Sequence, residues 1–88
     1  MEWQNVREQF PKRWVLIEAL EAESSENKRK IKEMAVISDF NKSQDAWAAY
    51  KKIHLEDRTR ELYILHTSNE DVEIIEEKFV GIRSRGYN

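Results

Sequence analysis

The stretch Trp14-Val15-Leu16-Ile17-Glu18-Ala19-Leu20-Glu21-Ala22 decides the fold of this 88-residue chain. Its first four residues are apolar, and glutamates then interrupt the apolar residues. A continuous apolar run followed by alternation is typical of a strand that is covered on both faces where it begins. We therefore expect residues 14–22 to form the most buried strand of a sheet.

A short helix should precede this strand. Between residues 2 and 10, the apolar residues Trp3, Val6 and Phe10 are spaced by three and four, which places them on one side of a helix. Pro11 should end the helix, because proline disfavours helical backbone at the residue before it. So short a helix is marginal alone, and we expect its apolar side to dock on the rest of the protein.

The residues after the first strand predict a hairpin and a second helix. The polar segment 24–29 should be an exposed connection, and residues 30–40 have the β-type composition of a second strand. From Gln44 to about Leu55 the apolar residues recur at helical spacing, and they are Ala46, Ala49, Tyr50 and Ile53. This periodicity predicts the second helix.

Two further strands and a tail should complete the chain. Residues 62–67 are bulky and β-branched, which predicts a third strand, and residues 68–71 have the composition of a turn. Residues 72–80 fit both helical and strand spacing, and we favour a fourth strand. The tail, residues 81–88, contains both glycines, and we expect it to be mobile.

These elements predict a single α+β domain over residues 1–88 with the order α-β-β-α-β-β. We expect a four-stranded, mainly antiparallel sheet with the helices packed on one face. Strand order 2-1-3-4 is favoured, because it places the Trp14 strand centrally and makes all neighbours antiparallel if the second helix crosses that strand. Order 1-2-3-4 also fits, but it leaves the most apolar strand on an edge.

Composition excludes several classes of function. Fifteen Lys and Arg against seventeen Asp and Glu leave a net charge of −2, so no overall field attracts nucleic acid or an anionic membrane. The chain has no cysteine, no glycine-rich phosphate loop and no paired-histidine metal motif, so we expect no cofactor and no metal. The first residues lack the pattern of a secretory signal, and we expect a soluble, cytoplasmic protein.

Two places contain residue types that catalysis or metal binding uses. His66-Thr67-Ser68 resembles a nucleophilic set, but neighbours on a strand point to opposite faces, so we expect His66 to be a half-buried strand end bonded to nearby backbone. Carboxylates also gather between residues 70 and 77, at Glu70, Asp71, Glu73, Glu76 and Glu77. We expect them to be the solvated side of an edge strand, so we assign no catalytic, cofactor-binding or metal residue.

The surface suggests three kinds of function. We expect a non-enzymatic protein–protein interaction or accessory module, whose partner is another protein or a second copy. A basic tip at Lys28–Lys32 separated from an acidic fourth strand would give a charge-asymmetric surface, and open edges on strands two and four would permit strand addition. Weak nucleic-acid binding through Lys28–Lys32 is one alternative, and a small enzyme that uses His66 is another. Trp3 and Trp47 are possible interface anchors, but we expect both in the core.

Three segments of the chain show a resemblance to known proteins. They are Phe10-Pro11-Lys12-Arg13-Trp14-Val15, Tyr63-Ile64-Leu65-His66-Thr67-Ser68 and Gly81-Ile82-Arg83. The chain resembles a family of small uncharacterised bacterial proteins that share a Phe-Pro-x-x-Trp-Val start, a Tyr-x-x-His-Thr-Ser strand end and a Gly-hydrophobic-Arg tail. This resemblance implies a bacterial cytoplasmic origin and transfers no site residue, because the family has no assigned activity.

Overall fold

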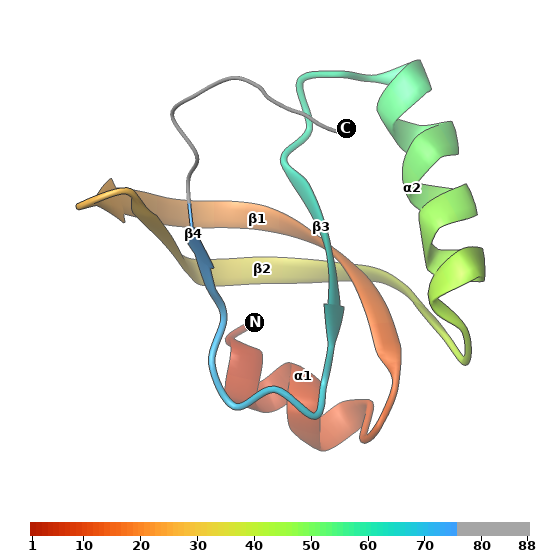
Figure 1. Ribbon diagram of the computed structural model, residues 1–88, viewed down its shortest axis with the longest axis horizontal. Helices are drawn as coiled ribbons and strands as arrows, with labels where there is room; N and C mark the ends of the chain where they lie inside the picture. Colours follow the sequence, from red (N-terminus) through yellow and green to blue (C-terminus); the bar gives the residue numbers. More distant parts are fainter. Residues whose placement is uncertain (76–88) are drawn as a thin grey trace.

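The computed structural model describes residues 1–75, which form one small α+β domain (Figure 1). Its elements are α1 (Trp3–Gln9), β1 (Trp14–Ser25), β2 (Lys28–Phe40), α2 (Ser43–Glu56), β3 (Leu62–His66) and β4 (Glu73–Ile75). The predicted succession of two helices and three strands is confirmed. The expected tail, and residues 76–80 of the expected fourth strand, lie outside the described residues.

β1 is the central strand, as its apolar run predicted. It pairs antiparallel with β2 on one side and with β3 on the other. The helix α2 leads the chain from the end of β2 to the start of β3 (Figure 1), and these two strands lie on opposite sides of β1. Val15, Leu16 and Ile17 of β1 are completely buried, as expected for a strand that is covered on both faces.

The two helices pack on opposite faces of the sheet, so the expectation that they share one face is wrong. Trp3 and Val6 of α1 pack with Val15 and Ile17 of β1. Leu16 lies between those two residues and points to the other face, where α2 packs against β1 and β3. The reason is β1 itself, because a strand that is apolar on both faces needs a cover on each.

β4 lies in a different place from the favoured order. It pairs antiparallel with the tip of β2, with Glu73 opposite Lys30, whereas order 2-1-3-4 puts the fourth strand beside the third. The chain crosses the α1 side of the sheet instead of turning back: the Trp3 indole Nε1 donates to the Asn69 carbonyl oxygen at 2.9 Å, and Val72 is buried in the α1 cluster. Order 2-1-3-4 is therefore not confirmed beyond its first three strands.

The long β1–β2 hairpin is irregular. Shifts in its register leave three residues without a partner on the opposite strand, namely Leu20, Lys32 and Ile37. Such bulges bend and twist a hairpin, and Figure 1 shows the strands curving. A bulge also reverses the alternation of side chains, which is why Ile31 and Met34 enter the same core although they are three residues apart.

Candidate functional site

His66 ends β3, and its ring makes local contacts. Nδ1 accepts a hydrogen bond from the backbone N–H of Ser68 at 3.2 Å and lies 2.8 Å from the Ser68 hydroxyl oxygen. The ring packs edge-on against Trp14, with centroids 5.0 Å apart. Within residues 1–75 no carboxylate hydrogen-bonds this ring, and the contacts are those expected of a half-buried strand end.

Thr67 is part of the fold. Its side chain is 3% exposed, and its hydroxyl donates to the Phe10 carbonyl oxygen at 2.6 Å and accepts from the Arg13 backbone N–H at 2.9 Å. Arg7 Nε donates to the Thr67 carbonyl oxygen at 3.0 Å. These bonds join the end of β3 to α1 and to the turn between α1 and β1, so Thr67 positions the shorter helix.

The basic hairpin tip is tied to carboxylates. Arg29 donates to both carboxylate oxygens of Glu61, with Nη2 2.8 Å from Oε1, and Lys32 Nζ lies 3.3 Å from Glu23 Oε2. Arg29 and Lys32 of the tip are therefore ion-paired with carboxylates of the same chain. The Arg29–Glu61 pair also holds the curved hairpin against the start of β3.

Glu61 has a second hydrogen-bond partner besides Arg29. The Tyr63 hydroxyl donates to Glu61 Oε2 at 2.7 Å. Hydrogen bonds from Arg29 lower the pKa of the Glu61 carboxyl, against the opposing effect of its partial burial. The pKa of the Tyr63 hydroxyl is raised to about 12. Burial is the largest cause, and the hydrogen bond to Glu61 is the second.

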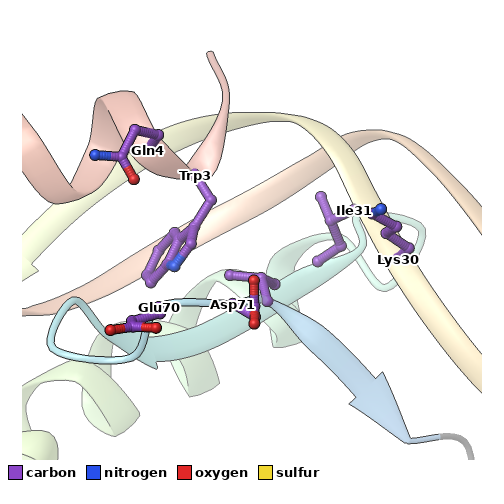
Figure 2. A pocket seen from close by; sticks show the side chains of 7 residues that line it. Trp3, Gln4, Lys30, Ile31, Glu70 and Asp71 are labelled. Carbon is purple, nitrogen blue, oxygen red and sulfur yellow. The ribbon is translucent and has the colours of Figure 1, made fainter.

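Within the described residues, the basic tip and part of the predicted acidic cluster are neighbours and are not separated. Lys30 pairs with Glu73 in the β2–β4 ladder, and Lys30 also lines a hollow of about 460 Å³ together with Glu70 and Asp71. Figure 2 shows this hollow, with Trp3 on one side and Lys30 on the other. Charges of opposite sign therefore lie side by side at this end of the molecule.

The carboxylates do not assemble a metal site within the part of the chain that the structure describes. No group of three or more His, Asp or Glu side chains there is placed to hold an ion. Glu76 and Glu77, which belong to the predicted acidic cluster, lie outside the described residues.

α2 presents two of the large exposed apolar side chains of the described residues, and Leu20 of β1 is another. Trp47 is 58% exposed and Leu55 is 60% exposed, while Ala46 is the buried residue of this helix. The expectation that both Trp3 and Trp47 belong to the core is confirmed for Trp3, which is 8% exposed, and is wrong for Trp47. The longer helix therefore covers the sheet with a narrow strip and leaves apolar surface uncovered.

Trp47 belongs to a row of rings along α2. It packs edge-on against Tyr50, with centroids 5.4 Å apart, and Tyr50 stacks on His54 at 5.5 Å. Spacings of three and four residues place all three rings on one side of the helix. This contact holds the exposed indole in position.

A shallow hollow of about 320 Å³ lies between this row of rings and β3. Trp47 and Tyr50 line it from α2, and Leu62, Tyr63 and Ile64 line it from β3. We call these five residues the α2–β3 groove. None of them has a formal charge at neutral pH, which distinguishes the groove from the hollow in Figure 2.

Beside the groove, β3 forms an edge of the sheet, and its ladder with β1 shows which backbone groups point outward. At the two ends of the pair, Ala19 N–H donates to the Glu61 carbonyl and Thr67 N–H donates to the Arg13 carbonyl, each at 2.9 Å. Antiparallel ladders alternate between bonded and outward-facing residues. The odd-numbered residues of this strand therefore bond to β1.

The even-numbered residues of β3 consequently face away from β1. Leu62 and Ile64 direct their backbone N–H and C=O groups outward along the groove, and within the described residues no other strand pairs with this side. The outer side of β2 is covered only in part: β4 pairs with Lys28–Lys30, and the Met1 carbonyl accepts from the Met34 N–H at 2.9 Å. The open edge expected on strand two is therefore partly covered, whereas no described strand pairs with the outer side of β3.

One signal for this edge was present in the sequence. Residues 62–66 contain no lysine, proline or acidic residue, whereas natural edge strands are usually blunted by such residues. The signal was missed because the favoured order placed a fourth strand over this edge.

Comparison with known proteins finds no relative: no family model, no curated protein and no solved structure matches the chain. The resemblance to small bacterial proteins therefore stays a prediction. Among residues 1–75, no helix has the length and apolarity needed to cross a membrane.

Proposed function

We propose that this protein is a non-enzymatic protein–protein interaction module that receives its partner at the α2–β3 groove. The observation that carries this proposal is an open backbone edge directly beside an exposed tryptophan. The outward backbone groups of Leu62 and Ile64 offer hydrogen bonds to an added strand, and Trp47 offers an apolar anchor. Strand addition at an exposed edge is a recurring mode of recognition, and tryptophan is enriched at interface hot spots.

The same two features are liabilities in a protein without a partner. An uncharged edge strand is a template for uncontrolled pairing, and a large exposed apolar side chain favours aggregation. β3 has neither charges nor proline to prevent such pairing, and Trp47 lies next to it. A specific partner that covers both features removes both liabilities.

The two alternatives have less support. Nucleic-acid binding through Lys28–Lys32 would compete with the ion pairs that Arg29 and Lys32 make with Glu61 and Glu23. An enzyme that uses His66 would first have to free Nδ1 from Ser68. Binding at the groove needs no such rearrangement and no cofactor, and we place the module in a bacterial cytoplasm.

Two assays on the full chain test the proposal. The first is selection of peptides from a random library displayed on phage, and the second is sedimentation equilibrium to detect self-association. We expect Trp47-dependent binding in at least one assay: the Trp47→Ala variant loses it, and Leu55→Ala keeps it. Leu55 is the matched control because it is equally exposed on the same helix but does not line the groove. Absence of Trp47-dependent binding in both assays contradicts the proposal.

A further inference from the structure

We infer that the partner in the α2–β3 groove is a second copy of this chain, joined through the open edges of two β3 strands about a two-fold axis at Ile64. This inference rests on the proposed function and names the partner. The dimer would contain one continuous sheet that runs from one copy into the other.

The first argument is the symmetry of the open edge. β3 spans Leu62–His66, and its outward-facing residues are Leu62, Ile64 and His66, so Ile64 is the centre. The His66 carbonyl already accepts from the Asn69 N–H at 3.1 Å, and in the dimer it would accept a second hydrogen bond. A two-fold axis at Ile64 pairs this residue with its own copy and pairs Leu62 with His66 of the second copy. Every outward-facing residue of the strand then has a partner.

The second argument is the chemistry of the paired side chains. In this register Tyr63 faces Leu65 of the second copy, and none of the five strand residues has a formal charge at neutral pH. Like charges opposite one another destabilise an antiparallel pair, and this pairing contains none. Aromatic and aliphatic cross-strand pairs instead stabilise it.

The third argument is the position of α2. A two-fold axis that extends an antiparallel sheet is perpendicular to the sheet, so both copies of α2 lie on the same face. α2 packs against β1, β2 and β3 of its own copy, and β3 is the strand beside the two-fold axis. The two helices would therefore approach each other from opposite sides of that axis.

The fourth argument is the exposure of Trp47, which decides between a second copy and an extended peptide. An added peptide strand would satisfy the edge of β3, but it brings no second helix to pack beside α2, which carries Trp47. A second copy brings a strand for the edge and a helix for the indole, which is 58% exposed in the single chain. It therefore covers both features at once.

Cysteine cross-linking tests the register, because the chain has no cysteine of its own. In Ile64→Cys, two bonded antiparallel residues would place their Cα atoms about 5.5 Å apart, which suits a disulfide. In Leu62→Cys, the two cysteines would lie four residues apart along the paired strands, roughly 13 Å, which is too far. Leu55→Cys measures cross-linking by random collision, since Leu55 is exposed and outside the groove.

We expect Ile64→Cys to form a covalent dimer about tenfold faster than Leu55→Cys under mild oxidation, because pairing raises the local concentration of the two thiols. Leu62→Cys should form it no faster than Leu55→Cys. A dimer of the unmodified chain that shows no preference for Ile64→Cys overturns the two-fold axis at Ile64.

Sedimentation equilibrium of the unmodified chain keeps the test independent of how the cysteine variants fold. We expect a dimer whose dissociation constant rises about tenfold or more in Trp47→Ala and stays unchanged in Leu55→Ala. A strict monomer that still binds phage-selected peptides through Trp47 overturns the second copy and leaves the proposed function intact. A strict monomer that binds no peptide overturns both.

Discussion

The two apolar layers of this protein differ in how completely they are closed. On the α1 face, Trp3, Val6 and Met34 are buried, and the indole N–H of Trp3 is bonded to a backbone carbonyl. On the α2 face, Ala46 is the one residue of the helix that is buried, and Trp47 projects into solvent. The helix of seven residues thus belongs to the core, and the helix of fourteen residues forms one wall of an open groove.

This difference has a physical explanation. A helix as short as α1 is unstable without tertiary contacts, so its apolar residues must all be used in packing. α2 is long enough to be held by a narrow strip of contacts and still present other side chains. α1 therefore serves stability, whereas α2 keeps exposed side chains that the proposed binding would use.

The largest expected effect is the difference in stability between the alanine variants of the two tryptophans. Trp3→Ala should lower the free energy of unfolding by about 3–5 kcal/mol, because it empties a site in the closed core. Trp47→Ala should cost less than about 1 kcal/mol in dilute protein, where no partner covers it. Urea unfolding followed by circular dichroism measures both values. Equal losses would mean that the α2 layer is as closed as the α1 layer.

The next effect concerns the attachment of α1 to the sheet. Thr67→Val should lower the free energy of unfolding by about 1–3 kcal/mol, since it leaves the Arg13 N–H and the Phe10 carbonyl without their partner in a buried place. Thr67→Ser keeps the hydroxyl and should recover most of the loss. A valine variant as stable as the original chain would show that these hydrogen bonds do not hold α1 in place.

A smaller effect is expected where the curved hairpin meets β3. Glu61→Gln should cost about 1 kcal/mol at neutral pH, because it weakens a partly exposed ion pair. Glu23→Gln is the control. It weakens the Lys32–Glu23 ion pair, which is more exposed than the Arg29–Glu61 pair, and it should cost less. If both changes are neutral, the Arg29–Glu61 pair does not stabilise the hairpin.

The pH dependence of this pair has a defined sign. The folded protein lowers the pKa of Glu61 from its ordinary 4.5, so the stabilisation is present above that pH and is lost as the pH falls below it. The stability difference between the original chain and Glu61→Gln should therefore shrink in acid. Urea unfolding at neutral and acidic pH measures the change, and a difference that grows in acid contradicts it.

The smallest effect appears only in alkali. Since the pKa of Tyr63 is raised to about 12, its stabilising contribution is present below the ordinary value near 10 and is lost as the pH rises from there to about 12. Tyr63→Phe should remove this part of the alkaline loss of stability. Ultraviolet titration of the two proteins locates the ionisation, and a difference curve centred at the ordinary value would contradict the raised pKa.

Much of the fold was predictable because its signals are local. The run Trp14–Ile17 predicted a strand covered on both faces, and its central place in the sheet is confirmed. The helical spacing of Ala46, Ala49 and Ile53 likewise predicted α2. Residues spaced regularly along the chain report which side of an element is apolar, whatever the element later packs against.

The sequence predicted the type of candidate site but not its location. A surface for another protein or a second copy was expected, but at strands two and four and with a charge-asymmetric surface. The bulges at Leu20, Lys32 and Ile37 left no recognisable signal, because a bulge depends on the register of two strands.

The sequence by itself determined the helices, the three strands and the central place of β1, because these follow from periodicity and apolar content. Only the tertiary structure decided that, among residues 1–75, no strand pairs with the outer side of β3 and that Trp47 is exposed beside it. The physical reason is the distance along the sequence between the residues that interact. The path of the chain after β3 depends on contacts such as the bond from Trp3 to Asn69, whose partners are distant in the sequence, and no local pattern records them.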